Sequence, residues 1–164
     1  MRRMRLLVWL LGFFVTSHAT AQVHHYIFFG LERKGIAAES FLDSGAEGAQ
    51  LKYTWRELEP EEGHYDFSAI RADLAILRAH GKKLFLQIQD VSFDPRIVNV
   101  PKYLLSDPEY HGGIALQYEY DGKHEDKARP AGVVARRWDP AVQRRFQFLL
   151  YALGKEFDGL VEGV

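Results

Sequence analysis

The sequence has no cysteine, which excludes disulfide bonds and thiolate metal sites. It also lacks an excess of basic residues: 21 Lys and Arg stand against 22 Asp and Glu, so no strong positive field favours nucleic acid. A Gly-rich phosphate loop and a nucleophile elbow are both missing. These absences argue against nucleotide-dependent and serine-hydrolase chemistry, and they leave an ordinary globular composition with 47% hydrophobic residues.

The amino terminus has the pattern of a secretory signal. Arg2, Arg3 and Arg5 form a basic start, residues 6–15 are continuously apolar, and Ala19-Thr20-Ala21 is a small-x-small cleavage pattern. The apolar run is shorter than the roughly 20 residues of a membrane span. We therefore expect residues 1–21 to be a signal peptide, with a secreted or periplasmic product that keeps no membrane anchor. An uncleaved anchor is the alternative.

The mature chain, residues 22–164, alternates between strand-like and helix-like segments. Strands are expected at 24–30, 48–55, 83–89 and 160–164, and helices at 34–43, 68–80 and 139–157. Residues 56–67 are expected to form a loop and residues 90–137 a long irregular connection. Strand–helix alternation predicts an α/β fold with a parallel sheet and right-handed crossovers.

The segment 83–89 gives the clearest strand pattern. Leu84, Leu86 and Ile88 alternate with Phe85, Gln87 and Gln89. In a barrel, one face of each strand meets the helices and the other meets the interior. We expect the aliphatic face to pack on helices and the amide face to point inward, with Gln89 nearest the carboxyl-end mouth.

An ordered motif lies at residues 55–67. It reads Trp55, then Glu59-Pro60, Gly63 and Tyr65-Asp66-Phe67. This order resembles the loop after the second strand of (β/α)8-barrel glycoside hydrolases, in the broad clan of β-galactosidases, cellulases and xylanases.

Three further segments support the same resemblance. Residues 81–89 resemble the third strand of these barrels, residues 100–104 resemble their Pro-x-Trp-Leu element with Tyr103 in place of Trp, and residues 137–142 resemble the segment before the fourth strand. Together they span residues 24–164. The resemblance implies a TIM (β/α)8 barrel truncated after about four strands, since a whole barrel needs about 250 residues. It also implies a carbohydrate substrate and hydrolysis of O-glycosyl bonds in the full-length form.

The sequence assigns no catalytic residue. Retaining glycosidases use two carboxyls about 5–5.5 Å apart, and the resemblance places them at strands four and seven. Glu162 is the carboxyl in the last expected strand, but Val161 precedes it where the clan has Asn, so a structural, barrel-lining role is the favoured alternative. We expect no hydrolase activity from these 164 residues alone and no cofactor, since the reaction needs water and carboxyls.

Candidate substrate-binding residues lie where strands meet the expected mouth. Sugars offer C–H faces to aromatic rings and hydroxyls to carboxylates and amides. The alternatives are that Trp55 is a core residue, that Trp138 caps the following helix, and that the polar residues form a satisfied layer inside the barrel. The candidates are Trp55, Glu57, Gln87, Gln89, Asp90 and Trp138.

Other interpretations stay open. The His24-His25 pair shows no metal partners at a recognisable spacing. A half-barrel leaves an unpaired edge, so self-association through the open sheet edge is expected. The alternative to a hydrolase is a non-catalytic secreted carbohydrate-binding protein or a degenerate half-barrel.

Overall fold

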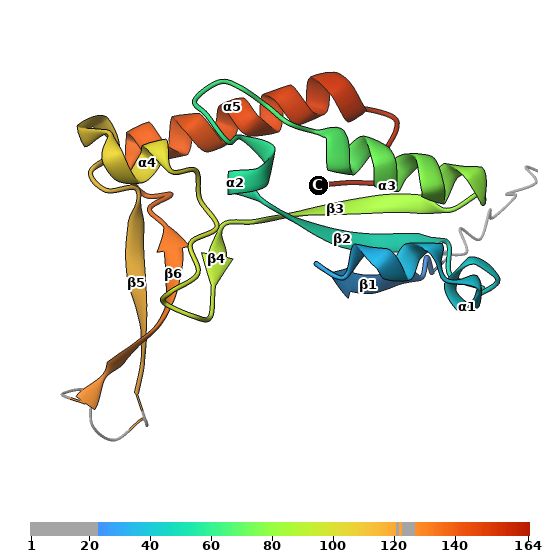
Figure 1. Cartoon of the computed structure of the whole chain (residues 1–164), viewed down its shortest axis with the longest axis horizontal. Helices are drawn as coiled ribbons and strands as arrows, with labels where there is room; N and C mark the ends of the chain where they lie inside the picture. The colour runs from blue at the N-terminus through green and yellow to red at the C-terminus, as the bar shows by residue number, and fades with distance from the viewer. Residues whose placement is uncertain (1–22, 121, 123–126) are drawn as a thin grey trace, which may run out of the picture.

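The computed structural model describes residues 23–120, residue 122 and residues 127–164. The proposed signal peptide, residues 1–21, lies outside the described residues. A parallel sheet and a smaller antiparallel sheet are joined end to end, with two long helices along one face of the parallel sheet (Figure 1). Within the described residues no helix has the length and apolar character needed to cross a bilayer.

The parallel sheet has the order β1-β2-β3, formed by β1 (Tyr26–Gly30), β2 (Gly48–Thr54) and β3 (Lys83–Gln89). β2 and β3 pair along their whole lengths, from Gly48↔Lys83 to Thr54↔Gln89. Their carboxyl ends therefore lie at one edge of the sheet. All three strands were predicted within two residues of their observed bounds.

The last expected strand, residues 160–164, is reduced to a single parallel bridge between Gly163 and Phe85. The bridge lies on the side of β3 away from β2. The backbone N–H groups of Glu162 and Leu86 donate the two hydrogen bonds of this bridge, to Leu84 and Gly163.

The two long helices are α3 (Ser68–Ala79) and α5 (Pro140–Phe157). Asp139 caps α5, accepting a hydrogen bond from the Ala141 N–H at 2.9 Å, and Pro140 occupies the first turn. Gly81 follows α3 with a positive φ of 65°, which explains the helix end.

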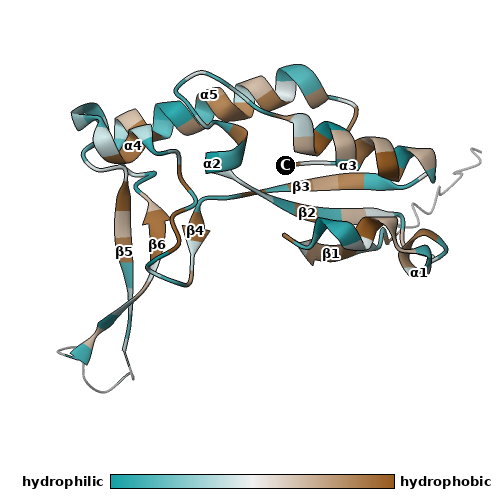
Figure 2. Cartoon of the chain, in the orientation of Figure 1, coloured by the Kyte–Doolittle hydropathy of each residue, from teal (hydrophilic) through white to brown (hydrophobic). Residues whose placement is uncertain are grey.

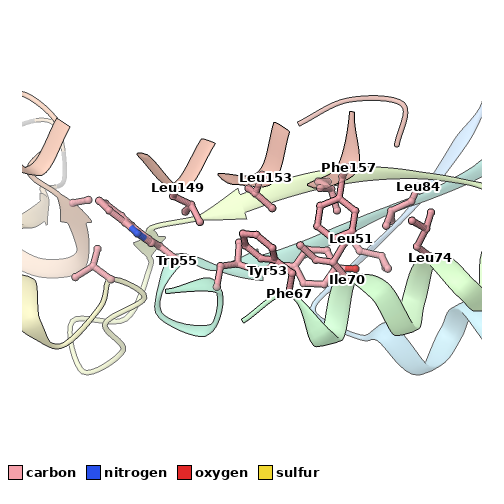
Figure 3. Close-up of a cluster of buried hydrophobic side chains, with 14 of the residues drawn as sticks. Leu51, Tyr53, Trp55, Phe67, Ile70, Leu74, Leu84, Leu149, Leu153 and Phe157 are labelled. Atoms are coloured by element: carbon pink, nitrogen blue, oxygen red, sulfur yellow. The ribbon is translucent and has the colours of Figure 1, made fainter. Parts of the chain in front are cut away.

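Between them, α3 and α5 bury the aliphatic face of the sheet. Figure 3 shows Leu149, Leu153 and Phe157 of α5 and Ile70 and Leu74 of α3 packed around Leu51, Tyr53 and Leu84 of the sheet. The hydropathy colouring of Figure 2 shows the alternation of apolar and polar residues in these elements. The sequence pattern predicts a buried stripe of Ile70, Leu74 and Leu77 in α3, and all three are buried. It also predicts burial of Leu150 in α5, but Leu150 is 39% exposed, because it lies beside the β3 edge rather than over it.

Two predicted segments differ in the structure. The helix expected at 34–43 is split into the 3-10 turn η1 (Arg33–Ala37) and α1 (Glu39–Leu42), because Ala38 between them is extended. The loop expected at 56–67 begins with the short helix α2 (Trp55–Leu58), which Thr54 and Glu57 close with a capping box.

The prediction that residues 90–137 form an irregular connection was wrong. The segment contains β4 (Val91–Ser92), α4 (Tyr103–Ser106), the 3-10 turn η2 (Pro108–Tyr110), β5 (Ile114–Glu119) and β6 (Arg129–Ala135). The strands form an antiparallel sheet of order β4-β6-β5, which projects beyond the carboxyl end of β3 (Figure 1).

Candidate sugar-binding mouth at the carboxyl ends of the strands

The carboxyl ends of β2 and β3 bring together most of the predicted polar site residues. Thr54 is the last residue of β2 and pairs with Gln89, the last residue of β3. Glu57 follows in α2, and Asp90 follows Gln89 directly. We call the surface formed by Glu57, Gln89, Asp90, Arg137 and Trp138 the mouth.

Asp90 is 2% exposed and is held by Arg137. The Nε atom of Arg137 lies 2.7 Å from Oδ2 of Asp90, and its Nη2 donates to Oδ1 at 3.0 Å. Burial raises the pKa of the Asp90 carboxyl, and the guanidinium beside it opposes that rise. Arg137 also lies over the Phe146 ring of α5, with its Cζ 5.0 Å from the ring centroid. The carboxylate is therefore fixed between β3 and α5.

Gln89 leaves an acceptor unused. Its amide Nε2 donates to the carbonyl of Val91 at 3.0 Å, but its Oε1 is buried and has no hydrogen-bond partner in the described part of the chain. Buried polar atoms are normally satisfied, so the unpartnered Gln89 acceptor is unusual, and it follows β3 at the position next to buried Asp90.

Glu57 borders the mouth on the β2 side. Its carboxylate accepts from the Thr54 backbone and hydroxyl, each at 2.9 Å, and from Arg33 at 3.3 Å. Partial burial alone would raise the pKa of Glu57, but these hydrogen bonds and the Arg33 charge hold it below its usual value. Glu57 is thus ionised and committed to the cap of α2, with part of its surface exposed.

Arg33 was not among the predicted residues. It joins the end of β1 to β2 and α3: its Cζ is 5.3 Å from the Tyr53 ring centroid, and its Nε is 3.9 Å from Oδ2 of buried Asp73. Tyr53 donates to the same Asp73 oxygen at 2.8 Å. Nothing in the local sequence marks Arg33, because its partners are distant in the chain.

The aromatic candidates lie in different surroundings. Trp55 is 0% exposed: its Nε1–H donates to Glu59 at 2.8 Å, and its ring meets Phe146 edge-on at 5.1 Å. This position agrees with the alternative that Trp55 belongs to the core, and its ring offers no free face. Trp138 is 64% exposed and follows Arg137, so its ring is available at the mouth.

Gln87 lies apart from the mouth. It accepts from Gln50 Nε2 at 3.0 Å on the sheet face opposite α3 and α5, and lines a cavity of about 330 Å³ beside β3 with Phe146 and Leu150. The amide face of β3 therefore points away from the helices, as predicted.

Glu162 lies at the opposite end of the sheet. It accepts from Tyr26 at 3.0 Å and pairs with Lys83 at 3.1 Å, both at the starts of their strands. Those contacts hold the pKa of Glu162 below its usual value. Six residue steps along β3, or about 20 Å, separate Lys83 from the mouth. The structure therefore favours the structural alternative for Glu162.

Comparison with known proteins finds no matching family model and no matching curated protein. Among solved structures, the catalytic domain of β-amylase from Paenibacillus polymyxa is similar with a TM-score of 0.56 at 12% identity, covering 83% of this chain and 34% of that one. The exo-β-1,4-mannosidase Op5Man5 from Opitutaceae bacterium strain TAV5 gives 0.46 at 12% identity, covering 78% and 18%.

A third neighbour is a variant of GH5_18 from Bifidobacterium longum in complex with Manβ1-4GlcNAc, with a TM-score of 0.41 at 13% identity, covering 50% of this chain and 23% of that one. The chain thus spans about a third or less of each neighbour. At such low identity the β-amylase similarity concerns the fold: a mixed α/β arrangement with a parallel sheet, as in TIM-barrel enzymes.

The described residues contain no group of three or more His, Asp or Glu side chains arranged to hold a metal ion. The chemistry available at the mouth is hydrogen bonding by Gln89, Asp90 and Glu57, together with stacking on Trp138.

Proposed function

We propose that this chain forms the first strands of a glycoside hydrolase-like (β/α)8 barrel, and that the mouth at their carboxyl ends binds carbohydrate. The observation that carries the proposal is the end of β3, where the unused acceptor of Gln89 adjoins buried Asp90. Active sites of such barrels lie at the carboxyl ends of the strands. The solved neighbours, whose names are those of glycoside hydrolases, support the substrate class.

Each group has a definite role in this proposal. The Gln89 Oε1 atom accepts a hydrogen bond from a sugar hydroxyl. Asp90, fixed by Arg137, accepts a second one, and Trp138 packs against a C–H face of the sugar ring. Glu57 borders the same site with its exposed carboxylate edge. Gln87 and Trp55, proposed with the same set, support the site from the open sheet face and from the core.

The proposed reaction in the complete barrel is hydrolysis of an O-glycosyl bond. That reaction uses two carboxyls, about 5–5.5 Å apart for retention or about 6.5–9.5 Å apart for inversion. Asp90 and Glu57 are each engaged by an arginine, and Glu162 lies at the far end of the sheet. We assign the catalytic pair to none of them and expect sugar binding without turnover from these residues.

The test is binding of neutral hexasaccharides, followed by NMR or calorimetry, to the chain and to Gln89→Leu. Losing one hydrogen bond, about 1 kcal/mol, weakens affinity roughly fivefold. Gln143→Leu, at an exposed position of α5, is the matched control and leaves affinity unchanged. Equal affinities of Gln89→Leu and the parent chain would remove the basis of the proposal.

We also propose export. The basic and apolar pattern of residues 1–21 supports a signal peptide and a secreted or periplasmic product. The intact mass and amino-terminal sequence of the protein recovered outside the cytoplasm test this: a product beginning at Gln22 supports it, and an uncleaved amino terminus contradicts it.

A further inference from the structure

A concave surface lies along α5, away from the mouth. It is a cavity of about 560 Å³ between α5 and the loop that precedes α3. Its lining includes Tyr65, Phe67, Phe148, Tyr151, Lys155 and Glu156. We call it the outer groove. About 16 Å of the α5 axis, at 1.5 Å per residue, separates Tyr151 from Pro140, which lies two residues after Trp138.

The outer groove exists because α5 carries aromatic residues on its solvent side. Leu149, Leu153 and Phe157 form the stripe that meets the sheet (Figure 3). Phe148 and Tyr151 lie on the other side of the helix and are 53% and 74% exposed. Two large, solvent-exposed aromatic side chains beside a cavity indicate a binding surface rather than core packing.

The opposite wall of the groove is rigid. Tyr65 and Phe67 are stacked, with ring centroids 5.7 Å apart and planes at 15°. Phe67 is 3% exposed and meets Phe157 of the core edge-on at 5.7 Å. This wall is therefore anchored in the core, so a ligand that packs against it does not have to order it first.

The rim is polar, and the two charged residues that line it, Lys155 and Glu156, have opposite signs. Lys155 and Glu156 are adjacent on α5, and Glu156 is held by Arg71 of α3, whose Nη1 donates to it at 3.2 Å. With the hydroxyls of Tyr65 and Tyr151, the rim offers both donors and acceptors. An acidic or basic partner gains little from such a rim, whereas a neutral polyhydroxyl ligand matches it.

We infer that the outer groove is a second binding site, specific for a neutral oligosaccharide. Pyranose rings present flat C–H faces to aromatic walls, and their hydroxyls bond to carboxylate, ammonium and phenol groups. The volume is within the range of small-ligand sites. The ligand class follows from the lining of the groove itself, so the inference stands independently of what binds at the mouth.

The test is a titration of the isotope-labelled full chain with cellohexaose, mannohexaose and maltohexaose. Backbone amide shifts at Lys155 and Glu156 report the groove, and those at Asp90 and Arg137 report the mouth. Tyr151→Ala weakens the groove response about tenfold or more, and Gln89→Leu leaves it unchanged. Tyr118→Ala is the control, a tyrosine of β5 that is 58% exposed and far from the groove in the chain.

The outcomes separate the two sites. Saturable shifts at the groove that Tyr151→Ala removes support the inference, whatever happens at the mouth. Shifts confined to the mouth overturn it while leaving the proposed function in place. Failure of all three sugars to shift Lys155 and Glu156 at millimolar concentration also overturns it. So does a change in sedimentation, rather than in sugar response, on Tyr151→Ala, since that result makes the groove a protein interface.

Discussion

Glu59 is a carboxylate with 0% exposure whose charge is met by three donors. The Trp55 indole and the Gly63 backbone N–H donate to it at 2.8 and 3.0 Å, and Arg145 forms an ion pair with it. Arg145 in turn donates to the Tyr103 hydroxyl at 3.2 Å. A buried charge is tolerated only when its partners are in place, so this network fixes the loop after β2 against α5.

Asp90 gives a pH-dependent prediction at the residue scale. Its pKa is raised in the folded state, mainly by burial. At pH values between the ordinary aspartate pKa, about 4, and the raised pKa of folded Asp90, the folded state binds more protons than the unfolded state. The free energy of unfolding therefore falls as pH rises through this range. Asp90→Asn removes this dependence. The stability of Asp90→Asn relative to the parent should therefore improve as pH rises through this range. Urea unfolding from pH 3.5 to 7 measures the difference.

Asp66 provides a control of opposite sign. Hydrogen bonds from Ser68 hold the pKa of Asp66 below its usual value. Its stabilising contribution is present above the unfolded pKa and is lost as pH falls through the folded one. Asp66→Asn should therefore become less stable, relative to the parent, as pH rises. Parallel pH trends for the two variants would contradict the assigned environments.

At the scale of elements, the antiparallel sheet depends on close backbone approach. A Cβ atom on Gly132 of β6 would lie 2.1 Å from the Ser92 carbonyl of β4 and 2.9 Å from the Gln117 side chain. We predict that Gly132→Ala destabilises the protein by about 1–3 kcal/mol, because the backbone of β4 must move away. Hydrogen exchange at Val133 and Val134 and denaturant unfolding measure the effect.

Gly154 is the matched control. It lies in the interior of α5 at an exposed position, and a Cβ there meets nothing within 4 Å. Gly154→Ala should stabilise the protein by about 0.5–1 kcal/mol through helix propensity. A neutral effect of Gly132→Ala would show that β4 does not pack on β6 as described.

The elements that were predicted well are those whose burial follows a simple period. β3 alternates strictly and α3 has a clear apolar stripe, so both were found nearly at their bounds. The strand β6 was missed because Pro130 and Gly132 look like strand breakers; they are tolerated where the strand starts and where β4 passes close. The helix α2 was signalled by Thr54-x-x-Glu57, a capping box that can be read from the sequence.

The sequence predicted where the candidate site lies, at the carboxyl ends of the parallel strands. It did not predict the surroundings of each side chain there. Strand ends placed Gln89, Asp90 and Glu57 together because parallel strands finish at the same edge. Whether an aromatic side chain is buried depends on its tertiary partners: the Trp55 indole donates to Glu59, whereas Trp138 is 64% exposed and has no side-chain hydrogen bond within the described residues. Arg33 acts through residues far away in the chain, so no local pattern marks it.

At the scale of the whole molecule, the parallel sheet has one face without a helix in the described structure (Figure 1). Phe28 and Gln50 are register partners on this face, and Phe28 is 55% exposed with Lys52 5.1 Å from its ring centroid. We propose that this face and the outer edge of β1 drive self-association.

Phe28→Glu tests that proposal. Burying one phenylalanine contributes about 1.5–3 kcal/mol, so its loss should weaken association tenfold or more, measured by sedimentation across a concentration series. The new carboxylate can pair with Lys52, so the fold itself should be kept. Ile97→Glu, at a loop position that is 52% exposed, is the control. Association that survives Phe28→Glu unchanged would place the contact elsewhere.

The antiparallel sheet also affects how the chain closes on itself. Phe85 must meet Gly163 far along the sequence, and the entropy cost of closing a loop grows with its length. The pairs Val91↔Val134 and Ile114↔Ala135 fold the intervening chain back on itself. Once they form, the path from β3 to Gly163 shrinks to about the length of one β-α-β unit. The projecting sheet thus lowers the entropy cost of bringing Gly163 to Phe85, and it should form before the segment around Gly163 pairs with β3.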